Sequence, residues 1–99
     1  MNDDDFFSYL MEIGYLTPRT LPNGEVGAVT QMLFTGALVG GLDRIGYKTR
    51  FCYPTISEAL TALAEWSGDG DPPGNWIKQK GPVERSNPNL DWDQAISAP

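Results

Sequence analysis

The chain has 99 residues, of which 40% are hydrophobic and 20% charged, and its 13 acidic and 7 basic residues give a net charge of −6. This composition is typical of one small globular domain and excludes a disordered or fibrous chain. No apolar run reaches the roughly 20 residues of a membrane-spanning helix, and the acidic start MNDDDFF lacks the positive charge of a signal peptide.

The rare residue types restrict the chemistry. Histidine is absent and cysteine occurs once, as Cys52, so the commonest general base, a zinc site and an internal disulfide are all disfavoured. Asp69 and Asp71 stand one residue apart, but Pro72 and Pro73 occupy positions where a calcium loop needs further ligands. The sequence therefore predicts a non-enzymatic protein with no catalytic residue, no metal and no cofactor.

The first predicted element is a helix over about residues 4–13. Four apolar residues recur at the spacing of one helical face: Phe6, Tyr9, Leu10 and Ile13. Asp3, Asp4 and Asp5 suit its start, where carboxylates complement the helix dipole, and Gly14 suits its end. The alternative interpretation of this Asp triplet is that it imitates phosphates for a basic partner.

A hairpin is predicted over about residues 29–53. A turn is expected first at residues 21–25, because Pro22 presets φ while Asn23 and Gly24 tolerate positive φ, and a turn of this kind could join the strands of a short hairpin. Residues 29–43 are rich in apolar and β-branched side chains, and residues 43–46 fit a type I turn closed by a left-handed Gly46. Residues 47–53 alternate as a strand does, with Tyr47, Thr49, Phe51 and Tyr53 on one face.

A helix over about residues 56–66 is predicted to cover this hairpin. Thr55 and Glu58 have the spacing of a capping box. An apolar stripe follows, made of Ile56, Ala59, Leu60, Leu63 and Trp66. The predicted fold class is thus α+β: a small antiparallel sheet packed by this helix, with an N-terminal helix and an irregular C-terminal tail.

Residues 68–74 end the helix and form a loop that two prolines stiffen. We expect this loop to present Trp76 and the cations that follow it at the surface. The segment from Pro82 onward is polar, and we expect a single domain over residues 1–90 with a flexible tail over residues 91–99.

One constellation suggests a binding surface. If residues 74–81 fold back along the sheet, a basic and aromatic patch forms from Lys48, Arg50, Trp76, Lys78, Lys80 and Arg85. Such a patch could bind a protein or a nucleic acid. The simpler alternative is that the aromatic residues are core and the lysines are merely solvated.

Three strings carry a resemblance: GLDRIGY from Gly41, RFCY from Arg50, and GDGDPPGNWIKQKG from Gly68. Together they resemble a family of small proteins encoded by bacteriophages and prophages, over about residues 33–90. The resemblance implies a protein that acts in the cytoplasm of an infected bacterium. Small acidic phage proteins of this kind, such as the anti-CRISPR proteins, are often inhibitors that bind a host or defence complex.

By that analogy, an inhibitor of nucleic-acid-handling machinery could offer carboxylates to a groove that expects phosphates. The candidate acidic face consists of Asp3, Asp4, Asp5, Asp91 and Asp93. The alternatives are a nucleic-acid-binding accessory module that uses the basic patch, and an assembly component of the virion. The expected partner is a protein complex, with nucleic acid as the alternative and no membrane.

Overall fold

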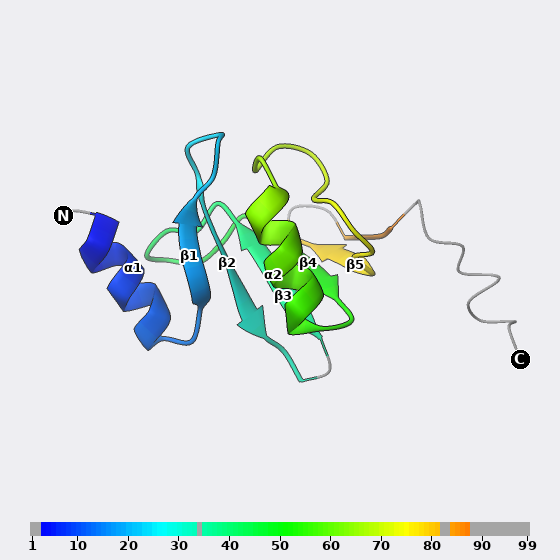
Figure 1. The fold of residues 1–99 in the computed structure, drawn as a ribbon, viewed down its shortest axis with the longest axis horizontal. Helices are drawn as coiled ribbons and strands as arrows, with labels where there is room; N and C mark the ends of the chain where they lie inside the picture. The colour runs from blue at the N-terminus through cyan, green and yellow to red at the C-terminus, as the bar shows by residue number, and fades with distance from the viewer. Residues whose placement is uncertain (1–2, 34, 82–83, 88–99) are drawn as a thin grey trace, which may run out of the picture.

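The computed structural model describes residues 3–33, 35–81 and 84–87. Within these residues the elements are α1 (Asp3–Glu12), β1 (Leu16–Thr20), β2 (Val26–Gln31), β3 (Gly36–Gly40), β4 (Thr49–Tyr53), α2 (Ile56–Glu65), β5 (Lys78–Lys80) and β6 (Arg85–Ser86). The strands form one antiparallel sheet in which each strand pairs with the next along the chain (Figure 1). The predicted α+β class is confirmed, with more strands than the predicted hairpin contains.

Helix α1 begins and ends close to its predicted bounds. The helix ends at Glu12. Gly14 follows it with a φ of +112°, a positive value of the kind that glycine adopts after helix ends. The Tyr15 N–H then donates to the Leu10 carbonyl at 2.9 Å. Leu10 is fully buried, but Ile13 lies beyond the helix and is exposed, so the predicted apolar face is one residue too long.

The turn predicted at residues 21–25 joins β1 to β2 and is confirmed. The Leu21 N–H donates to the Glu25 carbonyl at 2.8 Å, and the Glu25 N–H donates to the Asn23 side-chain oxygen at 2.9 Å. Strand β1 is an edge strand, and Pro18 lies where its register against β2 shifts, between Leu16 and Arg19; proline, which has no N–H, is tolerated at edges and bulges.

The predicted continuous strand over residues 29–43 is wrong in one respect, since the chain reverses inside it. The Met32 N–H donates to the Thr35 carbonyl at 2.8 Å, and β2 and β3 pair on either side of this turn. The turn at residues 43–46 is confirmed, because the Asp43 carboxylate accepts from the Ile45 and Gly46 N–H groups. The left-handed glycine of this connection is Gly41 (φ +70°), and not Gly46 as predicted.

Helix α2 packs on one face of the sheet because two glycines of β3 leave room for it. A Cβ at Gly36 would lie 2.6 Å from the Thr55 carbonyl oxygen, and a Cβ at Gly40 would lie 2.6 Å from the Trp66 ring. Leu38 lies between them on the same face and is fully buried. The glycines that make residues 29–43 a poor helix thus form the groove for both ends of α2.

The cap of α2 is close to the predicted capping box. The Glu58 N–H donates to the Thr55 hydroxyl oxygen at 3.1 Å, and the hydroxyl in turn donates to the Glu58 carboxylate at 3.0 Å. At the other end the Arg19 guanidinium donates to the Leu63 and Ala64 carbonyls, both at 2.9 Å. Both ends of α2 therefore have side-chain caps that satisfy free backbone groups.

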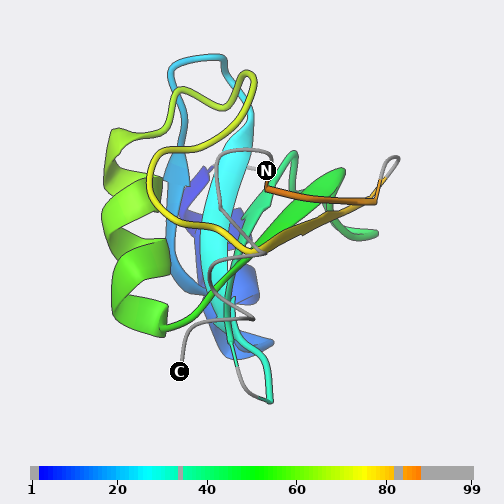
Figure 2. The same ribbon diagram turned by 90° about the vertical axis from the view of Figure 1, so that its right-hand side faces the viewer.

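The opposite face of the sheet is covered only in part. Helix α1 packs there through a second buried cluster, in which Leu10 contacts Ala28, Val39 and Leu42. The sheet twists, and β4, β5 and β6 turn away from α2 at the far end from α1 (Figure 2). Within the described residues, neither α1 nor α2 covers the part of this face that β4 and β5 form.

Candidate binding surface

The uncovered part of the sheet carries a row of cations, which we call the basic strip: Arg50, Lys78 and Lys80. Strand β5 pairs antiparallel with β4, so that Arg50 lies directly opposite Lys80 and Cys52 lies directly opposite Lys78. Residues directly opposite one another point to the same face of a sheet. The Lys78 and Lys80 side chains are 43% and 41% exposed.

The charges of the basic strip are only partly balanced. Glu84 lies 2.6 Å from the Lys78 ammonium and 3.8 Å from that of Lys80, so among the described residues one carboxylate contacts two of the three cations, and these four groups together carry a charge of +2. Like charges directly opposite each other on neighbouring strands are destabilising. The Arg50 guanidinium lies 6.0 Å from the centre of the half-exposed Tyr47 ring, and its buried Nε has no hydrogen-bond partner among the described residues.

The hydrogen bond from Lys78, and then the charges of Lys78 and Lys80, hold the pKa of the Glu84 carboxyl below its ordinary value of 4.5. A lowered pKa contributes stability that is present above the unfolded-state pKa and is lost as pH falls through the folded-state pKa. We therefore expect wild type to lose more stability than Glu84→Gln between about pH 6 and about pH 3. Urea unfolding across this range tests it, and parallel curves for the two proteins would contradict it.

Trp76 is not at the surface, and this part of the predicted patch is wrong. Its side chain is only 1% exposed and lies in the cluster under α2, with its ring centre 5.1 Å from that of Phe51. Its backbone carbonyl accepts from the buried Asn87 side chain at 2.9 Å. A large apolar ring at the start of β5 gains more from burial than from display, and the loop before it returns the chain to the core.

Arg85 also lies outside the basic strip. It pairs with Gln79, which points to the opposite face from Lys78 and Lys80, and its guanidinium lies 5.0 Å from the centre of the Trp76 ring. It also donates to the Gln79 side chain and forms an ion pair with Asp71. Within the fold, Arg85 therefore covers the Trp76 ring and is paired with Asp71, and its predicted role in partner binding stays a prediction.

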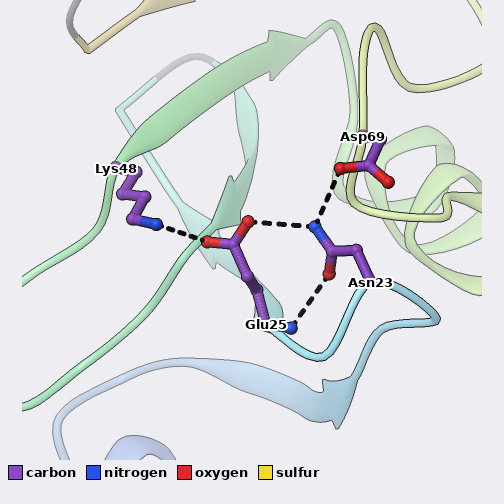
Figure 3. A network of polar contacts seen from close by, with 4 residues as sticks. All are labelled: Asn23, Glu25, Lys48 and Asp69. Carbon is purple, nitrogen blue, oxygen red and sulfur yellow. Dashed lines mark hydrogen bonds and ion pairs between the residues drawn. The ribbon is translucent and has the colours of Figure 1, made fainter.

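Lys48 belongs to a separate polar network (Figure 3). Its ammonium lies 3.1 Å from the Glu25 carboxylate, and the other oxygen of Glu25 accepts from Asn23 at 2.9 Å. Asn23 also reaches Asp69, at 3.4 Å. The network joins the β1–β2 turn to the loop after α2, so Lys48 connects loops and is not part of the basic strip.

The predicted acidic face is not assembled within the described residues. Asp3, Asp4 and Asp5 form the start of α1, and Asp5 is exposed. Asp91 and Asp93 lie outside the described residues, as does the predicted tail over residues 91–99. The proposed joint action of these five carboxylates therefore stays a prediction.

Two members of this surface were missed in the sequence. Glu84 reaches Lys78 and Lys80 because β5 and β6 form a hairpin, and a pair of lysines followed by Gly81 and a glutamate is the signal that could have indicated it. Cys52 is half-buried, and it lies on the face of the basic strip, directly opposite Lys78.

The part of the chain that the structure describes contains no metal-binding cluster and no membrane-spanning helix. No three cysteine or acidic side chains there are arranged to hold a metal ion, and Asp69 and Asp71 bind Asn23 and Arg85 respectively. Neither described helix has the length and apolar character needed to cross a bilayer. No protein-family model, curated protein or solved structure matches the chain.

Proposed function

We propose that this protein is a non-enzymatic binding protein that uses the basic strip to engage an acidic surface on a protein partner. The observation that carries the proposal is the direct opposition of Arg50 and Lys80, with Lys78 beside them, on an uncovered face of the sheet. Such an arrangement costs folding energy in the free protein. An acidic partner would supply the missing counter-charges.

The electrostatics of the whole chain favour a defined contact over general attraction. The net charge of −6 repels polyanions at long range, whereas the basic strip has a local balance of +2. A complementary acidic patch on a protein therefore has to meet the strip at short distance and in one orientation. This supports specific recognition, in which charge complementarity selects the partner.

The resemblance to small phage-encoded proteins supports a more particular role. On that basis we propose that the partner is a host or defence complex in the infected bacterium and that binding inhibits it. The test is plaquing of a phage that a defence system restricts, on cells that express either this protein or a variant in which Lys78 and Lys80 are both glutamate. Restored plaquing with wild type alone is expected. Continued restriction with both proteins would contradict inhibition.

A nucleic-acid-binding role is the second candidate, because the Tyr47 ring beside Arg50 adds an aromatic surface to the cations. Burial of Trp76 removes the larger stacking surface that this role would use. A fluorescent 20-nucleotide single strand, titrated at about 50 and about 200 mM salt, distinguishes the two roles. Our proposal expects no binding at the higher salt. Tight binding that Lys78→Ala and Lys80→Ala weaken would favour the nucleic-acid role instead.

A further inference from the structure

A second feature lies on the other side of the sheet from the basic strip. A cleft of about 200 Å³, which we call the α2 cleft, runs between the outer side of α2 and residues 73–75. Its polar and charged lining includes Tyr53, Glu58, Thr61, Glu65 and Asn75. No lysine or arginine lines it among the described residues.

Two of the three hydroxyl groups that line the α2 cleft, those of Tyr53 and Thr61, already donate their hydrogens within the protein. The Tyr53 hydroxyl donates to the Pro73 carbonyl at 2.6 Å, and the Thr61 hydroxyl donates to the Ser57 carbonyl at 3.0 Å. Both oxygens can therefore only accept from a ligand. The carboxylates of Glu58 and Glu65 are acceptors as well, so acceptors predominate in the lining and favour a ligand that brings donors.

The electrostatic potential in the α2 cleft is negative. The pKa of the Tyr53 phenol is raised, first by burial and then by the negative charges of Asp71 and Glu58. Arg85 forms an ion pair with Asp71, which leaves Glu58 and Glu65 as the charges that line the cleft itself. A ligand with several hydrogen-bond donors and a positive charge would match both the acceptor-rich lining and the negative charges of the cleft.

A single metal ion does not match this geometry. Glu58 and Glu65 are seven residues apart on α2, which separates their backbone positions by about 10 Å along the helix axis. One ion needs its oxygen ligands within about 2.5 Å. An elongated organic cation is a better match, because its apolar part can lie on Ala62 and Pro73 between the acceptors.

We propose that the α2 cleft binds an arginine side chain of a protein partner. A guanidinium carries five N–H donors in one plane, whereas a lysine ammonium carries three around one point. The acceptors of the cleft come from both of its walls, α2 and the loop at residues 73–75, which favours the wider group. The site is independent of the basic strip and lies on the opposite face of the sheet.

The test uses the full chain, labelled with ¹⁵N, and the peptide N-acetyl-Ala-Arg-Ala-amide. Amide chemical shifts of Thr61, Gly74 and Asn75 should move on titration. The same peptide with neutral citrulline should leave them in place, and the peptide with lysine should bind more weakly. Equal shifts with all three peptides, or no shift at these residues, would overturn the proposal.

Variants make the test specific to the cleft. Glu65→Gln should lower the affinity for the arginine peptide about two- to fivefold, the range expected for one exposed ion pair. Glu12→Gln, an exposed carboxylate at the end of α1, should have no effect. Equal affinities for these two variants would also overturn the proposal. An unchanged spectrum of the free Glu65→Gln protein shows that the variant is folded. The substitution should not affect binding of a partner at the basic strip.

Discussion

Trp76→Ala is expected to lower the free energy of unfolding by about 3–5 kcal/mol, the range for removing a large aromatic side chain from a core. The Trp76 ring is almost fully buried and contacts Phe51 edge-on, at 75° between the ring planes. Arg85 lies over it and would lose this contact. Urea unfolding followed by circular dichroism measures the loss.

Trp76→Phe is the matched variant, because it keeps an aromatic ring and should lose clearly less stability. The alternative, in which Trp76 anchors a partner at the surface, predicts the reverse pattern. In that case Trp76→Ala would unfold within about 0.5 kcal/mol of wild type, as surface substitutions usually do. That result would mean that Trp76 is not part of the core and that its burial does not fix the start of β5.

Replacing Lys78 and Lys80 with glutamate together is expected to weaken partner binding about a hundredfold, which is about 2.7 kcal/mol. The change turns two attractive contacts into repulsive ones, and like charges across an interface cost several kcal/mol. Stability should fall modestly, because the two glutamates lose the ion pairs with Glu84 and repel it, while the glutamate at position 80 gains a favourable cross-strand pair with Arg50.

Single variants separate the basic strip from net charge. Lys80→Glu and Lys48→Glu alter the net charge equally, but Lys48 belongs to the Glu25 network. We expect Lys80→Glu to weaken binding of the partner captured by affinity pull-down from host lysate clearly more than Lys48→Glu does, as measured by titration calorimetry. Equal losses would mean that overall charge, and not the basic strip, governs binding.

The sequence was most informative where local patterns were strong. The alternation around Phe51 predicted β4, and Thr55 with Glu58 predicted the start of α2. In each case short-range geometry, either the period of two or the cap spacing, determines the structure without reference to distant residues.

Long-range packing could not be derived in the same way. The reversal at residues 32–35 includes no glycine or proline, and β2 and β3 form on its two sides because α2 and α1 cover their opposite faces. The burial of Trp76 depends on Phe51 and Arg85, neither of which is adjacent to it in sequence. The opposition of Arg50 and Lys80 likewise follows from the register of two strands, which the sequence alone leaves open.

Cys52 allows the most direct test of where a partner binds. It is the single cysteine of the chain, it is half-buried, and it lies on the face of the basic strip opposite Lys78. The measurement is its rate of alkylation by iodoacetamide, in the free protein and in the complex that the protein forms with a partner captured by affinity pull-down from host lysate. Binding at the basic strip predicts that the rate falls at least about tenfold in the complex. An unchanged rate in an intact complex would contradict the assignment of this face as the binding surface.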